Sequence, residues 1–235
     1  MKIDSDLIKN KNYTIPIAPS ILKHSQEYNV LASLRYLLPH KFESMVTGES
    51  PDLQDIVNGI GIEVTAAVRE NDMRASRAFA SLRKGDNKSI EKNKTIIDSS
   101  GYSIIPIRED KVAISTLGTS NGEKNFFQES IQRKIKKFQR YKTHFKKIGL
   151  AVILPEIPTL YFENHICEWI SEMFNENNES YDFVYVLSHR FCIYYDVWTK
   201  VSDKWSITNE EHQLLSTMAR MTAEGELSLT STEWI

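Results

Sequence analysis

The chain contains few cysteines, no long apolar run and little net charge. Only Cys167 and Cys192 occur among its 235 residues, which does not indicate a disulfide framework, so we expect free thiols in a reducing compartment. The opening residues Met1–Asp4 do not begin a signal peptide. No apolar run approaches the roughly 20 residues of a membrane span. These absences predict a cytoplasmic protein with no membrane partner.

Several common metal-binding and phosphate-binding patterns are also missing. The six histidines show no HxH or HxxxH spacing, and no pair of cysteines supports a structural zinc site. The segment Gly59–Gly61 lacks the third glycine and the following helix of a phosphate-binding loop. The sequence therefore argues against both of these sites.

The composition is that of an ordinary globular protein, with 41% hydrophobic and 26% charged residues. Helical and strand patterns follow one another in an order that predicts an α/β fold, with a mixed central β-sheet flanked by helices. Residues 88–99 are polar and ambiguous, and the chain turns polar after Trp198. The expected helices span residues 20–38, 70–83, 125–147, 160–174 and 210–221, and the expected strands 42–46, 52–57, 60–68, 102–107, 111–115, 150–154, 183–187 and 191–197.

The most informative motif is Ser50-Pro51-Asp52 followed by Gly61-Ile62-Glu63-Val64-Thr65. Asn58-Gly59 between them is a strong hairpin signal, so Asp52 and Glu63 are expected on neighbouring antiparallel strands. Such strands lie roughly 5 Å apart, which lets both carboxylates reach one divalent ion. Mg²⁺ favours a site with one or two carboxylates. The alternative is an ordinary turn followed by a strand whose glutamate faces water.

A second acid lies in an unexpected position on the first predicted helix. Glu27 precedes Val30, Leu31 and Leu34 at helical spacing, which places its carboxylate within the apolar stripe. An isolated buried carboxylate is costly, so it must be paired, protonated or bound to a metal. A structural ion pair with a nearby Arg or Lys is the alternative to a metal ligand.

The basic residues are concentrated between Arg133 and Lys147, where eight Lys or Arg occur without any Asp or Glu. Within this segment Lys134 lies on the edge of the apolar face formed by Phe127, Ile131 and Phe138, and is expected to face the sheet. Lys137 is the second choice for that role. The alternatives are a lysine stem that carries its ammonium back to water and a basic face that is merely solvated. The predicted solvated side carries Lys136, Arg140 and Lys147.

The chain resembles the PD-(D/E)XK, or restriction-endonuclease-like, nuclease superfamily over roughly residues 20–155. In that family the metal ligands are the motif aspartate and the strand acid, which correspond to Asp52 and Glu63. Some members add a glutamate from the first helix, for which Glu27 is positioned. The lysine expected two residues after the strand acid is Thr65 here. Other members carry this lysine on the following helix, which makes Lys134 the candidate.

The resemblance implies a nuclease that hydrolyses phosphodiester bonds in DNA and depends on Mg²⁺ or Mn²⁺. Asp52, Glu63 and Lys134 would be catalytic, Asp52, Glu63 and Glu27 would bind the metal, and the DNA backbone would be contacted by Arg133, Lys136, Lys137, Arg140 and Lys147. The alternative is a catalytically inactive protein of the same fold that binds nucleic acid or protein, which Thr65 favours.

The expected organisation has three parts. Pro16 and Pro19 predict an irregular N-terminal arm over residues 1–19, and the resemblance implies a restriction-endonuclease-like core over residues 20–155. Residues 156–235 would form a C-terminal extension of that domain or a small subdomain. This last part could extend the sheet, contact DNA or form a homodimer.

Overall fold

A computed structural model describes residues 17–68, 70–82, 87–108, 111–115, 120–136, 138, 145–154, 158–175 and 180–228. The chain forms two compact units. Unit 1 contains the described residues up to Ala67 and those from Gln128 onward, and unit 2 is the intervening segment Val68–Phe127.

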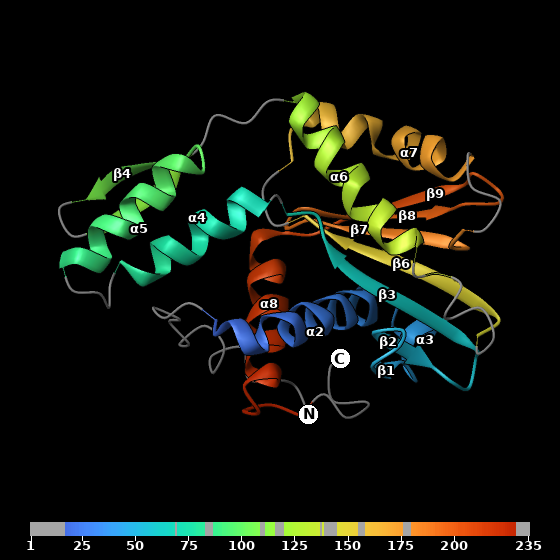
Figure 1. Cartoon of the computed structure of the whole chain (residues 1–235). Coiled ribbons are helices and arrows are strands. Elements are labelled where there is room, and N and C mark those ends of the chain that lie inside the picture. The colour runs from blue at the N-terminus through green and yellow to red at the C-terminus, as the bar shows by residue number, and fades with distance from the viewer. Residues whose placement is uncertain are drawn as a thin grey trace. The chain divides into compact units, whose positions relative to one another are not determined.

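Unit 1 is built on one seven-stranded sheet with the order β1-β2-β3-β6-β7-β8-β9. The three central strands β3, β6 and β7 run parallel, and the outer pairs are antiparallel. The expected mixed α/β sheet is therefore present, and β7 to β9 continue it beyond residue 155 (Figure 1). Its strands are β1 (Val46–Thr47), β2 (Leu53–Asp55), β3 (Ile60–Ala66), β6 (Lys147–Ile153), β7 (Phe183–Leu187), β8 (Phe191–Asp196) and β9 (Ser202–Ser206).

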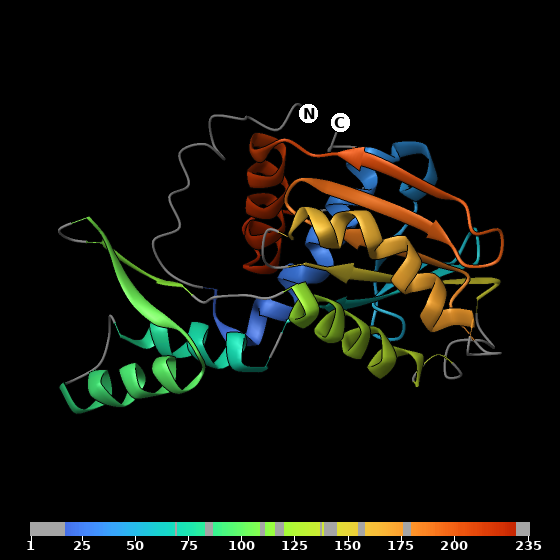
Figure 2. The same cartoon turned by 90° about the horizontal axis from the view of Figure 1, so that it is seen from above.

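Helices cover both faces of this sheet. One face is covered by α2 (Pro19–Leu37), α3 (Pro39–Phe42) and α8 (Asn209–Ala223), and α2 packs on α8, β3 and β6. The other face is covered by α6 (Ser120–Ile135) and α7 (Leu160–Asn175), which lie side by side in both views (Figures 1 and 2). The start of α8 is fixed by a capping box, because Thr208 Oγ1 accepts from the Glu211 backbone N–H and Glu211 returns the bond.

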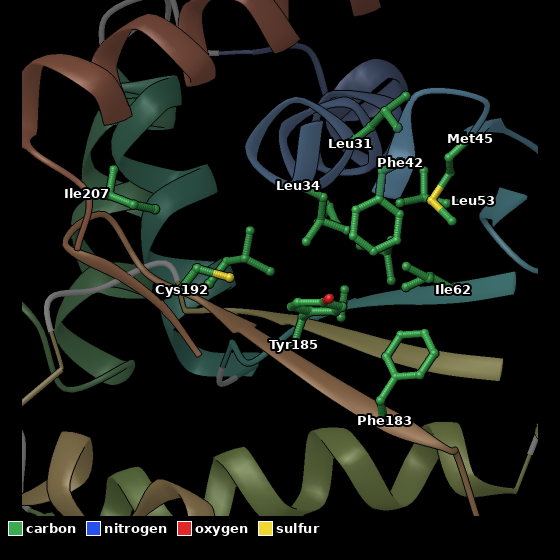
Figure 3. Packing of buried hydrophobic residues seen from close by; sticks show 14 residues of the cluster. Leu31, Leu34, Phe42, Met45, Leu53, Ile62, Phe183, Tyr185, Cys192 and Ile207 are labelled. Atoms are coloured by element: carbon green, nitrogen blue, oxygen red, sulfur yellow. The ribbon is translucent and has the colours of Figure 1, made fainter. Parts of the chain in front are cut away.

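The core of unit 1 lies between α2, α3 and the sheet. Figure 3 shows Phe42 of α3 packed over Tyr185 of β7, and their rings meet edge to face with centroids 5.9 Å apart. On α2, apolar residues at helical spacing form one buried face of the helix. On β3, every second residue points to the same side of the sheet, and Ile62 and Val64 pack against this face of α2. The labelled members are Leu31, Leu34, Phe42, Met45, Leu53, Ile62, Phe183, Tyr185, Cys192 and Ile207.

Unit 2 is a helical pair with a hairpin. It contains α4 (Glu70–Ser81), α5 (Asn87–Ser99), β4 (Ser103–Arg108) and β5 (Lys111–Ser115). The two strands form a separate antiparallel sheet, and Ala75, Ala78, Ile97 and Tyr102 form a small core. The expected hairpin is confirmed, and the ambiguous segment 88–99 is helical.

Two expected elements of unit 1 are wrong, and one strand of its sheet was not predicted. The strand predicted over 42–46 is replaced by the end of α3 and the short β1, because Pro39 begins a helical turn. The helix predicted over 125–147 ends at Ile135 in its described part, and Lys147 is instead the first residue of β6, paired with Ile60. The edge strand β9 was not expected, because its residues are largely exposed and lack an apolar pattern.

Among the residues that the structure describes, no helix is both long enough and apolar enough to cross a bilayer.

Candidate active site

The β2–β3 hairpin brings Asp52 and Glu63 to the same part of the sheet. Leu53 pairs with Ile62, so Asp52 precedes β2 directly beside the position of Glu63 on β3. The connecting turn is closed by Gly59, whose φ of 67° is readily adopted only by glycine. Asp55 supports this turn by accepting from the Asn58 backbone N–H at 3.0 Å. Burial opposes ionisation of Asp55, but the hydrogen bonds from Asn58 and Ser44 outweigh it and lower its pKa.

Asp52 is held in a fixed orientation by the neighbouring strand. Its side chain is buried, and Oδ2 accepts a hydrogen bond from the backbone N–H of Val64 at 2.8 Å. The other oxygen, Oδ1, lies 3.0 Å from the ammonium of Lys23. One carboxylate oxygen is therefore fixed by the backbone, and the other faces a cation.

Lys134 projects from α6 into the space between the two acids. Its Nζ lies 2.5 Å from Glu63 Oε1 and 4.0 Å from Asp52 Oδ2. One ammonium therefore lies close to an oxygen of each acid. The Lys134 side chain is only 15% exposed, which is inconsistent with an ammonium carried back to water. The backbone at this position is also anchored, because Tyr181 Oη donates to the Lys134 carbonyl at 2.9 Å.

Glu27 joins the same group of charges from α2, and its expected burial is confirmed, with 2% of the residue exposed. Lys23 Nζ lies 3.0 Å from Glu27 Oε1 and from Asp52 Oδ1, so one ammonium bridges the two acids. His24 Nδ1 lies 3.0 Å from Glu27 Oε2. Among the described residues, none donates a hydrogen bond to Glu27 Oε1, so the contact of this oxygen with Lys23 is an ion pair.

Sequence reasoning missed Lys23 and His24. Both precede Glu27 by one helical turn, at i−4 and i−3, and this spacing is the signal that could have identified them. Lys23 looked like an exposed helical lysine, and its side chain is indeed 64% exposed. Burial opposes its charge, but the carboxylates of Glu27 and Asp52 raise the pKa of Lys23, so this side chain carries a positive charge at neutral pH.

The result is an acid cluster, defined here as Glu27, Asp52 and Glu63, with a lysine between each neighbouring pair. No three Asp, Glu, His or Cys side chains among the described residues converge closely enough to enclose a metal ion together. The donor set nevertheless suits Mg²⁺, because this ion prefers carboxylate oxygen and needs only one or two carboxylates from the protein. At the buried oxygen Glu27 Oε1, however, the Lys23 ammonium already lies 3.0 Å away, so a metal ion there would compete with this lysine.

The predicted DNA-contacting residues do not all lie on one helix. Arg133 and Lys136 are exposed near the end of α6, and Arg133 donates to Ser130 Oγ at 3.2 Å. Lys147 is exposed but belongs to β6, because the strand begins earlier than its apolar residues suggested. Lys137 and Arg140 lie outside the described residues.

No protein-family model, curated protein or solved structure matches the chain. The geometry of the acid cluster and its two lysines is therefore the basis for assigning a function.

Proposed function

We propose that this protein is a Mg²⁺-dependent nuclease that hydrolyses phosphodiester bonds in DNA. The observation that carries the proposal is the position of Lys134, whose ammonium lies 2.5 Å from Glu63 Oε1 and 4.0 Å from Asp52 Oδ2. Two carboxylates beside a lysine suit metal-assisted phosphodiester cleavage, because the carboxylates can hold the ion and the lysine can oppose negative charge on the phosphate.

The replacement of the family lysine by Thr65 is compatible with this role. Side chains two residues apart on a strand point to the same face, so Thr65 shares the face of Glu63. Lys134 reaches Glu63 from α6, with its ammonium 2.5 Å from Glu63 Oε1. A cation supplied from a helix can therefore substitute for one supplied from the strand.

The order of elements supports the same proposal. A helix (α2) precedes an antiparallel meander (β1, β2 and β3), and α6 then leads to β6, which pairs parallel with β3. This is the order that the resemblance to the PD-(D/E)XK superfamily implies, with α4, α5, β4 and β5 inserted between β3 and α6. Cys167 and Cys192 are free thiols, which are typical of a reducing compartment, and we therefore place the activity in the cytoplasm.

In this mechanism the protein supplies position and charge. Asp52 and Glu63 would hold the ion, and the Val64 backbone N–H keeps Asp52 aligned. When bound, Mg²⁺ would make a water more acidic and neutralise charge on the scissile phosphate. Lys134 stabilises the charge that develops on the phosphate oxygens. Arg133, Lys136 and Lys147 would contact the DNA backbone without reading its sequence.

The test is a lysine relocation. Supercoiled plasmid and labelled single-stranded and duplex oligonucleotides are incubated with Mg²⁺ or Mn²⁺ and four forms of the protein: wild type, Lys134→Ala, Thr65→Lys, and the double variant. Wild type is expected to cleave, Lys134→Ala to lose most activity, and the double variant to regain part of it. Glu63→Gln is the inactive control. A wild-type protein that binds no divalent ion and cleaves none of these substrates would refute the proposal.

The second candidate is a catalytically inactive protein of the same fold that binds nucleic acid or another protein. The specific observation in its favour is that Lys23 and Lys134 already neutralise much of the acid cluster. The cleavage assay separates the candidates, since the inactive protein would retain oligonucleotides in a filter-binding assay without cutting them.

A further inference from the structure

The turn between β2 and β3 carries two large apolar side chains that face solvent. Ile56 is 74% exposed and Val57 is 83% exposed, and both follow Asp55, the last residue of β2. Turns favour polar residues and glycine, as at Asn58 and Gly59 of the same turn. Exposed apolar residues are common singly on a protein surface, but here two successive ones lie at the end of a hairpin. Ile56 and Val57 therefore form a compact apolar projection, which we call the apolar tip.

Hydrogen bonds on the inner side of the turn restrain the apolar tip. The buried carboxylate of Asp55 accepts from the Asn58 backbone N–H at 3.0 Å and from the Asn58 side-chain amide at 2.7 Å. It also accepts from the Ser44 hydroxyl at 2.8 Å. The side chains of Ile56 and Val57 are β-branched and therefore stiff at χ1. An apolar group that is already ordered loses little conformational entropy when it enters a partner.

Two exposed lysines lie beside this turn. The backbone N–H groups of Lys146 and Lys147 donate to the Gly59 carbonyl at 2.8 Å and 3.1 Å. Both lysine side chains are exposed, and the stem of Lys146 passes close to the turn, since a Cβ added to Gly59 would lie 3.1 Å from Lys146 Cγ. The carboxylate of Asp55, by contrast, is buried and is occupied by its hydrogen bonds within the turn. The charge beside the apolar tip therefore favours an anionic partner such as DNA.

The hairpin that carries the apolar tip also carries two members of the acid cluster, Asp52 and Glu63. Along an extended strand, the four positions from Gly59 to Glu63 span about 13 Å. One strand of a DNA duplex rises about 3.4 Å per base, so this length corresponds to about four base steps. A duplex that runs along the hairpin would therefore meet the apolar tip and the proposed cleavage site at the same time.

We propose that the apolar tip inserts as a wedge between stacked bases of duplex DNA, and that it selects duplexes in which one base step is already disrupted. Apolar side chains inserted in this way unstack a base step and kink the duplex. Unstacking costs less where a base is damaged or mismatched. Lys146 and Lys147 would hold phosphates beside the wedge. The inference rests on the proposed function, because it narrows the DNA substrate of that activity.

The experiment compares the affinity of the intact protein for two labelled duplexes of one sequence, of which the second has a central abasic site. Fluorescence anisotropy is measured with Ca²⁺ in place of Mg²⁺ to suppress cleavage. We expect wild type to bind the abasic duplex about fivefold more tightly or better, because the disrupted step is easier to open. The double variant Ile56→Ser, Val57→Ser should bind the two duplexes equally. The matched control is Val201→Ser, at a valine that is 55% exposed outside the hairpin, and it should keep the preference.

Both variants replace exposed side chains, so their melting temperatures should match that of wild type. The wedge is overturned if wild type binds the two duplexes equally or if the double variant keeps the preference. It is also overturned if the double variant instead abolishes self-association of wild type in sedimentation, which would assign the apolar tip to a second copy of the chain.

The same duplexes separate this inference from the proposed function. A preference for the abasic duplex without cleavage in Mg²⁺ would support the wedge and refute the nuclease activity. Cleavage without the preference would refute the wedge alone. When wild type cleaves the abasic duplex, the cuts should cluster about three to five nucleotides from the abasic site, and cuts spread evenly along the duplex would contradict the proposal.

Discussion

Lys134 of α6 lies 2.5 Å from Glu63 of β3, although 71 positions separate them in the chain. This contact joins β3 to a helix that comes after α4, α5, β4 and β5 in the chain. It also places the ammonium beside Asp52, so one lysine faces both acids of the β2–β3 hairpin. A lysine with only a structural role would balance Glu63, whereas a catalytic lysine would also control the rate of cleavage.

Substitution of Lys134 should distinguish these roles. Lys134→Ala is expected to reduce the cleavage rate by about 10²–10³, the scale for loss of one electrostatic donor in an active site, with little change in DNA affinity. The control is Lys136→Ala, two positions further along the chain and exposed. This variant should only reduce the slope of log affinity against log salt concentration, by about the value for one phosphate contact. Rates and affinities are measured on one duplex. Equal, small effects from both variants would assign Lys134 a structural role.

The Glu63–Lys134 pair should also be visible in stability. Glu63→Gln leaves a mostly buried ammonium with only Asp52 nearby, so we expect a lower melting temperature as well as loss of cleavage. Lys134→Met should likewise be destabilised, and the double variant should be more stable than the sum of the two losses predicts. Thermal denaturation of the four proteins measures the coupling. Additive effects would show that the two charges do not interact in solution.

Lys23 should compete with divalent cations. Its ammonium lies 3.0 Å from oxygens of both Glu27 and Asp52, where a cation would also be attracted. We expect Lys23→Met to bind Mn²⁺ at least tenfold more tightly, because the acid cluster loses one of its two positive charges. Calorimetry provides the affinities, with Lys92→Met on the exposed surface of α5 as the control. Weaker binding by Lys23→Met would mean that Lys23 instead organises the acids.

Stability should depend on pH through His189 and His212, whose rings meet edge to face with centroids 5.6 Å apart. The pKa values of His189 and His212 are lowered from an ordinary 6.5, first by burial and then by neighbouring charge. The unfolded chain therefore binds these protons more readily, so the free energy of unfolding should fall as pH drops below about 6.5. Urea denaturation at pH 7.5 and 5.5 measures this loss. It should be smaller in His212→Phe, and an unchanged loss would assign it to other groups.

The approach of β3 to the Ser50-Pro51-Asp52 turn requires glycine at position 61. A Cβ added to Gly61 would lie 2.5 Å from Pro51 Cγ and 3.2 Å from the Phe145 ring. Gly61→Ala should therefore displace the turn that carries Asp52, destabilise the fold by about 1–3 kcal/mol and weaken Mn²⁺ binding. Thr65→Ala on the same strand is the control. Unchanged Mn²⁺ affinity in Gly61→Ala would show that the position of Asp52 does not depend on this contact.

Local patterns were sufficient for much of unit 1 and for part of the site. The turn signal Asn58-Gly59 predicted the hairpin that brings Asp52 beside Glu63. Helical spacing placed Glu27 and Lys134 at apolar helix faces, and the structure brings both helices to this hairpin. The two alternatives of an exposed Glu63 and a solvated Lys134 are inconsistent with their burial.

Long-range pairing explains the features that the local patterns did not show. Lys147 continued a basic, helix-compatible segment, yet it pairs with Ile60 across the sheet. No local signal marked β9, since its exposed residues are fixed by pairing with β8. The spacing of Lys23 and Glu27 could indicate their ion pair, but the contact of Lys23 with Asp52 depends on the fold, because Asp52 belongs to a distant turn.

The parallel pairing of β3 with β6 has a consequence for the order of events during synthesis. From Ile60↔Lys147 to Ala66↔Ile153, every partner of β3 on this side is translated after unit 2 and α6 are complete. Unit 2 is built from sequence-local helix and hairpin contacts, which form quickly, whereas the β3–β6 ladder must wait for a long chain segment to close. The nascent chain therefore cannot unite Asp52, Glu63 and Lys134 in a finished sheet until β6 has left the ribosome.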